Sequence, residues 1–435
     1  MSGRPARDRD VTTVPSDVFA APTTGPRLMA GWADTARPAD LGAHLGRYGP
    51  LPGAAALIDT VHAAGLRGRG GAWFPTGRKL AAVASGRRRS VVVANGAESE
   101  PCSDKDHALL TVAPHLVLDG IVLAAKALGT DDAIMCVHRG DPVVAGVRAA
   151  IAQRAGFDSV AVRLVEVPAR FVASEESALV NFLNTGEARP VDTPPRPFER
   201  GVRGRPTLVD NVETLANVAL IARFGADWFR SVGTTATPGT MLITVGGAVA
   251  RPGVREIPLG TTISGVLGPS GDGSVGAVLV GGFGGNWVAL PSAADLRLAP
   301  EDLGAVGGSL GVGLLLALPA YACGLAETAR IARYLAGESA TQCGPCMFGL
   351  PAIVGDLDAL THGAPVVGRL RHRLGVVTGR GACAHPDGAV RLAASALTAF
   401  ADDVRAHAAG RPCAGVGRAP VIRVPTVTGP GLGWR

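Results

Sequence analysis

Short apolar runs alternate with segments of helical periodicity in the first half of the chain. The runs that lie between turn-forming residues, and that we expect to be buried parallel strands, are Ser90–Ala94, Asp132–Val137 and Ser159–Val165. The segments whose apolar residues recur at helical spacing are Leu57–Ala64, Pro114–Leu128 and Val143–Ala155. This alternation predicts a doubly wound α/β domain that binds its ligands at the carboxyl ends of the strands.

The apolar pattern changes after about Thr237. One helical turn at Ile263–Leu267 interrupts a series of β-like runs, which are Met241–Val245, Gly253–Ile257 and Ala277–Val280. From Pro300 onward Ala and Leu dominate, and helical spacing is found in Cys323–Ala336, Gly349–Leu360, Val366–Leu374 and Ala389–Ala408. We therefore expect a small β-rich domain followed by a helical bundle.

The two ends of the chain are polar and lack periodicity. We interpret residues 1–45 and 410–435 as flexible tails, because they are rich in Pro, Gly and Arg and offer little apolar surface to bury. The predicted boundaries between them are 46–236 for the α/β domain, 237–299 for the β-rich domain and 300–409 for the helical domain.

Composition narrows the class of protein. Apolar residues make up 47% of the 435 residues and charged residues 18%, which excludes wholesale disorder. The net charge of +6 comes almost entirely from Arg, and no basic block with interleaved aromatic residues is present, so we expect no nucleic-acid partner. The longest apolar run, Leu310–Ala320, is too short to span a bilayer, and the first residues lack an apolar signal segment. We expect a cytoplasmic protein, free or peripheral to a membrane complex, without direct membrane insertion.

Cysteines are concentrated near the end of the chain. Five of the seven follow Tyr321, and Cys343 and Cys346 form a C-x-x-C pair, with Cys383 further on. Such a set is typical of an incomplete group of iron–sulfur ligands. A zinc site that includes His385, or ordinary buried thiols, would explain the same pattern.

Two loops have the composition of ligand-binding segments. Arg67–Lys79 contains four glycines, and Lys79 is one of only three lysines in the chain; such a loop can bring backbone N–H groups and a cation to a phosphate. Asn95–Asp106 follows a predicted strand and carries Glu98 and Glu100, which can accept hydrogen bonds from ribose hydroxyls or an amide. An ordinary surface glycine loop and a solvated acidic loop are the simpler alternatives.

Two further segments carry acidic and amide side chains. They are Ser174–Leu179 and Arg205–Ala216, and in the second of them Asp210 or Asn211 opens an apolar helical run. Helix capping alone would account for both.

Taken together, these stretches resemble one family, the flavin-containing, NADH-oxidising subunit of NADH-quinone oxidoreductase (respiratory complex I) and its diaphorase relatives. Counterparts of the family motifs occur here in order between about Gly65 and Phe400. The motifs are R-G-R-G-G-A-G-F-P-T-G-x-K, N-A-D-E-x-E-P-G, G-E-E-T-A-L, G-x-P-T-x-x-N-N-V-E-T-L and E-S-C-G-x-C-x-P-C-R-x-G, then C-x-x-G-D-x-A. The resemblance implies a Rossmann-like flavin domain, a soluble-ligand-binding (SLBB) β-grasp domain and a four-helix bundle that holds a [4Fe–4S] cluster.

The resemblance also implies a function and a set of site residues. Hydride would pass from NADH to FMN, and single electrons would pass to the cluster and on to a partner, either a thioredoxin-like [2Fe–2S] subunit or a ferredoxin. The implied cofactor-binding residues are Gly68, Arg69, Gly70, Phe74, Lys79, Asn95, Glu98, Glu100, Glu175, Glu176, Asp210 and Asn211. Glu98 and Glu176 would also be catalytic, Phe74 would stack on an aromatic ring of the dinucleotide, and Cys343, Cys346 and Cys383 would be the metal ligands.

Several residues depart from the family pattern. Trp73 replaces a Gly, Asp210 replaces an Asn, and Thr193 and Arg196 replace a Lys and an aromatic residue, which favours the alternative of an electron-transfer subunit that no longer uses NADH. Ala340 replaces the first cluster Cys. A fourth ligand could then come from Ser339, Glu338, His385 or Cys323; otherwise the cluster would be [3Fe–4S] or absent, and the chain could be a binding scaffold without enzymatic activity.

Overall fold

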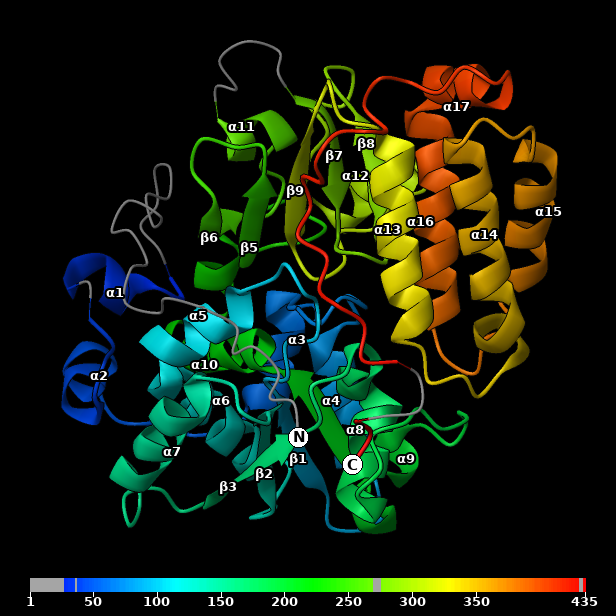
Figure 1. Ribbon diagram of the computed structural model, residues 1–435. Coiled ribbons are helices and arrows are strands. Elements are labelled where there is room, and N and C mark those ends of the chain that lie inside the picture. Colours follow the sequence, from blue (N-terminus) through cyan, green and yellow to red (C-terminus); the bar gives the residue numbers. More distant parts are fainter. Residues whose placement is uncertain (1–26, 36, 269–274, 430–432) are drawn as a thin grey trace.

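The computed structural model describes residues 27–35, 37–268, 275–429 and 433–435. The N-terminal half of the chain builds a four-stranded parallel sheet, shown in the lower part of Figure 1, in the order β3-β2-β1-β4. Its strands are β1 (Val91–Asn95), β2 (Ala133–His138), β3 (Val162–Val167) and β4 (Thr207–Asn211). Three of these are the predicted strands, within three residues at their start, whereas β4 was expected only as the cap of a helix.

Helices cover both faces of this sheet, because its strands bury alternate side chains in opposite directions. Val92 and Ala94 of β1 belong to one apolar cluster, and Val91 and Val93 belong to another that includes α8. The helices of this part are α3 (Leu57–Ala64), α4 (Thr76–Ala84), α5 (Lys105–Val112), α6 (Pro114–Ala127), α7 (Val143–Gln153), α8 (Glu176–Thr185), α9 (Pro197–Arg200) and α10 (Val212–Arg230). A Cβ atom on Gly120 of α6 would lie 1.9 Å from the Leu215 carbonyl oxygen, so α6 and α10 cross at backbone contact.

A second, mixed sheet has the strand order β6-β5-β9-β7-β8. Its strands are β5 (Thr240–Gly247), β6 (Gly253–Pro258), β7 (Val275–Val280), β8 (Asn286–Ala289) and β9 (Leu314–Pro319). The short helices α11 (Ile263–Leu267) and α12 (Pro300–Ala305) contribute to the apolar cluster on one face of the sheet. The apolar run at 310–320 contains a buried strand, β9, which lies between β5 and β7 in the sheet. In the sequence this strand follows the predicted domain boundary at residue 299. We propose to end the second domain at Pro319.

The remaining helices pack on the other face of the second sheet. They are α13 (Gly324–Gly337), α14 (Leu350–Thr361), α15 (Val367–Val377), α16 (His385–Ala399) and α17 (Ala401–Ala408), of which α13 to α16 lie side by side (Figure 1). Ile331 and Leu392 join the cluster that contains Leu279 and Leu316 of the sheet. The sheet is thus buried on both faces.

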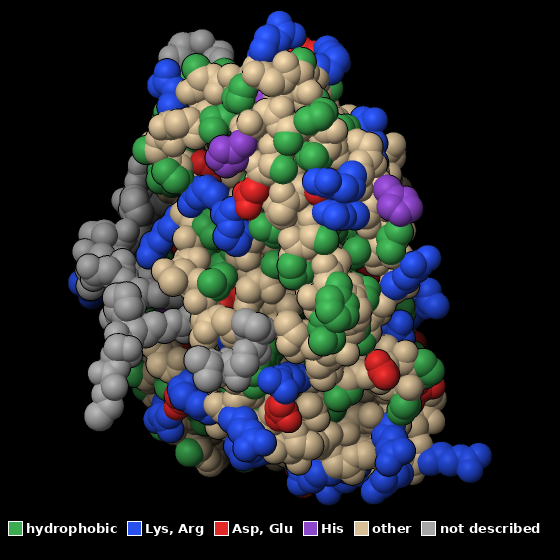
Figure 2. Space-filling model, turned by 45° about the vertical axis from the view of Figure 1, so that its right-hand side comes forward, with side chains coloured by type: hydrophobic (Ala, Val, Ile, Leu, Met, Phe, Trp, Pro, Cys, Tyr) green, Lys and Arg blue, Asp and Glu red, His purple; other side chains and the backbone are tan. Residues whose placement is uncertain are grey.

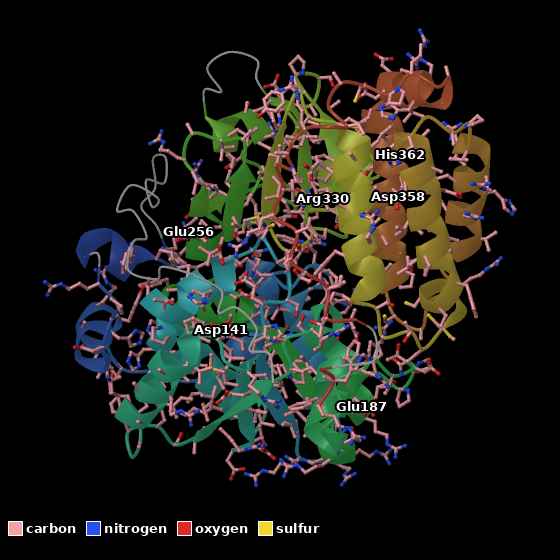
Figure 3. All side chains as sticks on the ribbon, in the orientation of Figure 1. Asp141, Glu187, Glu256, Arg330, Asp358 and His362 are labelled. Carbon is pink, nitrogen blue, oxygen red and sulfur yellow. The ribbon has the colours of Figure 1, made fainter. Side chains whose placement is uncertain are left out.

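The described residues of the N-terminal segment pack against other parts of the protein, contrary to the predicted tail at 1–45. They form α1 (Ala30–Thr35) and α2 (Leu41–Tyr48). The backbone N–H groups of Arg27, Leu28 and Met29 all donate to the carboxylate of Glu256 on β6, which Figure 3 labels near this segment. Leu28 and Met29 are fully buried. Residues 1–26 of the predicted tail lie outside the described residues.

The C-terminal segment is also packed rather than free. It leaves α17 and runs across α13 to the first domain (Figure 1). Arg330 of α13, labelled in Figure 3, donates to the Ile422 carbonyl, and the Val421 N–H donates to Glu327 at 2.7 Å. Trp434 is 3% exposed and lies under the Arg170 guanidinium. The described residues of the segment form no regular secondary structure, and several of their backbone groups bond to side chains of other elements.

On the face shown in Figure 2, Lys and Arg side chains are interspersed with apolar ones. Among the described residues, no single helix is both long and apolar enough to cross a membrane. The pair α5 and α6 passes that test only when the two are taken together, and they are bent by 94° relative to each other.

Candidate functional site

Two parallel strands bring amide side chains to one edge of the first sheet. Asn95 ends β1 and Asn211 ends β4, and the two residues are paired in register. Asn95 donates from Nδ2 to the Ser174 carbonyl, while Asn211 caps α10 by accepting the Glu213 N–H at 3.0 Å. The carboxyl edge of this sheet is where α/β proteins bind ligands.

Lys79 links three elements at this edge. Its ammonium group donates to the Val209 carbonyl at 2.6 Å and lies 3.6 Å from Asp210 and 3.7 Å from Glu176. Burial raises the pKa of Asp210 to about 6, against the opposing charge of Lys79. Asp210 Oδ2 has no hydrogen-bond partner among the described residues. Three predicted site residues from α4, β4 and α8 therefore meet, and one buried carboxylate oxygen is left for a ligand.

The acidic loop after β1 is buried, not solvated. Glu98 accepts from Ser103 Oγ at 2.5 Å and from the His107 N–H, and burial together with the charge of Asp106 raises its pKa to about 7. Glu100 accepts the Phe283 N–H, while its other oxygen is buried without a partner in the described part of the chain. Burial raises the pKa of Glu100 to about 8. Both carboxyl groups can therefore hold a proton near neutral pH.

Other predicted residues are found in different surroundings. Glu175 caps α8 through one oxygen, which accepts the N–H groups of Ser177 and Ala178, as the capping interpretation expected. Phe74 is 47% exposed. In the glycine loop, the Gly68 N–H donates to the Phe74 carbonyl, and a Cβ on Gly70 would lie 3.4 Å from that of Asn211. Gly70 thus brings the loop close to the strand edge.

The Arg69 side chain does not join this group. It is 1% exposed, donates to the Thr240 carbonyl of β5 and lies 3.7 Å from Glu213. Trp73 points the same way: its indole N–H donates to the Gly311 carbonyl, and its ring packs in the apolar cluster of the second sheet. Both side chains connect the glycine loop to the second sheet.

A buried network of Lys105, Asp106, Asn211 and Glu213 lies beneath the site, and the sequence alone did not predict it. Lys105 lies 2.6 Å from Asp106 and 2.9 Å from Glu213, and Asp106 accepts from Asn211 Nδ2. Glu213 also accepts the Leu242 N–H, which ties the network to the second sheet. The rarity of Lys in this chain was the one sequence signal that could have indicated Lys105.

Replacing Lys105 with methionine is expected to destabilise the protein by about 3 kcal/mol or more, because Asp106 and Glu213 would stay buried without their cation. Denaturant unfolding of the purified chain measures the effect. Lys126→Met, at an exposed position, is the matched control. A loss equal to that of the control would show that the network contributes no net stability.

A second group of predicted residues gathers at the lower end of the helical part, facing the first domain. One small pocket is lined by Val172, Pro190, Ala340, Gln342, Cys343, Cys346, Ala382, Cys383 and His385. Cys346 lies in a π-helical turn, Pro345–Gly349, and Cys383 precedes α16. Burial raises the pKa of Cys383 to about 11. The three predicted cysteines therefore share one site, although 40 residues separate the first from the last.

Comparison with known proteins agrees with this arrangement. Residues 61–220 match the Nuo51 FMN-binding domain, and residues 326–407 match the iron-sulfur binding region of NADH-ubiquinone oxidoreductase-F. The chain is 33% identical over 377 residues to the NuoF subunit of NADH-quinone oxidoreductase from Streptomyces coelicolor, covering 82% of this chain and 84% of the relative. The chain belongs to the NuoF family of NADH-quinone oxidoreductase subunits.

Other NuoF proteins and solved structures are similar to the same extent. NuoF of Escherichia coli is 33% identical over 377 residues, with 80% of this chain and 84% of the relative covered. An NAD+-reducing [NiFe]-hydrogenase in the air-oxidized state aligns with a TM-score of 0.80 and 30% identity over 91% of this chain and 70% of that one. The H2-reduced state gives 0.79 and 29% over 91% and 69%.

This NuoF family member lacks the first cluster Cys, and the structure separates the four candidate replacements. Cys323 lies at the start of α13, about 20 Å of helix away from the pocket. Glu338 is ion-paired with Arg170 at 3.0 Å and accepts the Thr428 N–H. Ser339 is buried beside Cys346 but is not a lining residue of the pocket. His385 lines it.

The imidazole of His385 is arranged as a ligand would be. Its Nε2 lies 2.8 Å from the Leu335 carbonyl, which can only accept, so Nε2 carries the proton and Nδ1 carries the lone pair. Nδ1 is buried and has no partner within the described residues. Burial lowers the pKa of His385 to about 4, which keeps the ring neutral. A carbonyl that fixes the tautomer is a common feature of metal-ligating histidines.

Proposed function

We propose that this NuoF family member oxidises NADH through FMN and passes single electrons to an iron–sulfur cluster and then to a partner subunit. The observation that carries the proposal is the convergence of the glycine loop, Lys79, Glu176 and the Asn95–Asn211 edge from separate segments of the chain. FMN, when bound, accepts two electrons together and can release them one at a time. The unpaired oxygens of Asp210 and Glu100 fit a ligand rich in hydrogen-bond donors.

We propose individual roles from the family resemblance, adjusted by the contacts described above. We assign FMN contact to the group Gly68, Gly70, Lys79, Asn95, Glu98, Glu175, Glu176, Asp210 and Asn211. Exposed Phe74 would stack on the dinucleotide, and Glu100 would accept from it. Glu98, with a pKa of about 7, would hold or release a proton beside the flavin, and Glu176 would orient Lys79. Arg69 is left out, because its side chain and its N–H are bonded elsewhere.

We further propose that the first domain is a Rossmann-like flavin domain, the second a β-grasp domain and the third a four-helix cluster domain. Cys343, Cys346 and Cys383 would supply three ligands of a [4Fe–4S] cluster, and Nδ1 of His385 the fourth. The donor set supports this, because imidazole replaces thiolate in some natural iron–sulfur centres. Ala340 also lines the pocket and packs on Val172 and Trp434, and its methyl group cannot ligate iron.

A partner would have to approach the cluster end of the bundle. Met347 and Phe348 follow Cys346 directly and are 48% and 70% exposed. Exposed apolar side chains next to the cysteine site support docking of a thioredoxin-like [2Fe–2S] subunit or a ferredoxin there.

The test of the proposed function is anaerobic purification followed by flavin, iron and sulfide analysis and stopped-flow mixing with NADH. We expect the purified protein to contain bound FMN. We also expect NADH to bleach the flavin absorbance within the dead time of the stopped-flow instrument or soon after. Bound flavin that dithionite reduces but NADH does not would favour the subunit that no longer uses NADH. A preparation with neither flavin nor iron after reconstitution would favour the binding scaffold.

Asp210 gives the site a pH dependence. Above a pH of about 6 its carboxylate neutralises part of the Lys79 charge, so we expect FMN affinity to fall as the pH rises through that value. Asp210→Asn should bind FMN more tightly at about pH 8, well above that pKa, and should lose the part of the pH dependence that comes from Asp210, since the amide stays neutral. Fluorescence titration of the deflavinated protein measures both. Equal pH dependence in the two proteins would contradict this role for Asp210.

A further inference from the structure

A third group of sulfur and nitrogen side chains lies at the opposite end of the bundle from the cysteine pocket. Cys323, His407 and Cys413 each offer one ligand atom, and these atoms all lie within 4.8 Å of one another. Cys323 caps the N-terminus of α13, His407 lies in the last turn of α17, and Cys413 lies in the C-terminal segment. Neither the flavin site nor the cysteine pocket uses them.

The Nε2 atom of His407 lies next to Cys323 and Cys413. His407 is fully buried, and its Nδ1 lies 3.3 Å from the Leu360 carbonyl, so Nδ1 carries the proton. Nε2 then faces Cys323 Sγ at 4.0 Å and accepts the Cys413 N–H at 3.0 Å. Tetrahedral zinc with bonds of about 2.3 Å to sulfur and about 2.0 Å to nitrogen spaces such ligand atoms about 3.6 Å apart. The Cys323–His407 pair at 4.0 Å is near this spacing, and the other ligand atoms, within 4.8 Å of one another, would move closer on binding.

The backbone holds the three segments in this position. A Cβ on Gly415 would lie 2.5 Å from the Cys323 nitrogen, so the C-terminal segment touches the start of α13 directly. Cys323 Sγ accepts the Ala326 N–H, which fixes the thiol at the start of α13. A zinc ion with two thiolates and one neutral imidazole carries no net charge, which suits a buried site.

We propose that Cys323, His407 and Cys413 bind a structural zinc ion that fastens the C-terminal segment to the bundle. Water would complete the coordination, since Cys413 is only partly buried. Zinc is favoured over harder cations because the donors are sulfur and nitrogen. Binding replaces the Cys413 N–H bond to His407 and releases the two thiol protons. The site does not depend on flavin, NADH or the iron–sulfur cluster.

The test is metal analysis and zinc-edge X-ray absorption of the full chain after purification without added chelator. We expect one zinc ion per chain with two sulfur ligands and one histidine nitrogen in its shell. Cys413→Ser should lose that zinc, whereas Cys136→Ser, at a buried thiol on β2, and Cys343→Ser, in the cysteine pocket, should keep it. The wild-type absorption spectrum decides the ligand set even if Cys413→Ser does not fold.

Three results would overturn the proposal. They are wild-type protein free of zinc when zinc is supplied, zinc retained by Cys413→Ser, and peptide mapping that finds a Cys323–Cys413 disulfide in place of two thiols. The fastening role has its own readout: removal of the zinc should speed tryptic cleavage after Arg418 and Arg423, which are exposed residues of the segment. Unchanged cleavage would exclude that role.

Discussion

His385→Leu is expected to convert the four-iron cluster to a three-iron cluster, with a loss of about one quarter of the bound iron. The variant removes the only pocket-lining nitrogen whose lone pair is buried and unpaired among the described residues, while the three cysteines remain. Electron paramagnetic resonance of the oxidised variant should show the three-iron signal. In the reduced wild-type protein, nitrogen hyperfine coupling should reveal the imidazole ligand.

A matched control and a rescue make this prediction specific. His362→Leu changes an exposed histidine at the end of α14, labelled in Figure 3, and should leave iron content and spectrum unchanged. The double variant Ala340→Cys, His385→Leu would restore the four-cysteine set of the family and should regain the fourth iron without nitrogen coupling. A full four-iron cluster in His385→Leu alone would show that another ligand, with Ser339 the nearest alternative, completes the site.

Lys79→Met is expected to weaken FMN binding roughly 10- to 100-fold, the range for losing a hydrogen bond to a charged group. The cation stands at the centre of the strand edge and approaches Asp210 and Glu176 from α4. Removal of Lys79 would also leave the Asp210 carboxyl buried without a neighbouring cation. The pKa of Asp210 would therefore rise above its present value of about 6.

The Lys79 prediction is measured by fluorescence titration with FMN. Lys126→Met is the control, because Lys126 is exposed on α6 and belongs to neither of the proposed cofactor sites. The double variant Lys79→Met, Asp210→Asn separates lost FMN contact from the cost of an unpaired buried acid: it should recover thermal stability but not FMN affinity. Recovery of affinity as well would mean that Lys79 acts only by neutralising Asp210.

The contacts of Trp73 change how the departures from the family pattern are interpreted. From the sequence, a bulky residue beside Phe74 favoured a site that had lost the dinucleotide. In the structure its ring packs against the second sheet and its N–H bonds to Gly311, so Phe74 stays exposed. The substitution at Trp73 therefore does not argue against NADH, and the stopped-flow experiment decides the donor.

Local sequence determined most of the elements and indicated the residues from which the proposed site is built. Helices such as Leu57–Ala64 and strands such as the run before Asn95 are set by periodicity and by turn residues close to them in the chain. The resemblance located the glycine loop, the acidic loop and the three cysteines, because close backbone approach and metal ligation restrict which residues can stand there.

Only the tertiary structure decided what depends on distant pairing. The run at Leu314–Pro319 has the same composition as a buried helix, and its pairing with β5 and β7 made it a strand. The polar ends of the chain were packed by single buried groups, Glu256 at one end and Trp434 at the other, which no local pattern reveals. The choice of His385 over three other candidates, and the meeting of Cys323, His407 and Cys413, required knowing which helix ends face the same way.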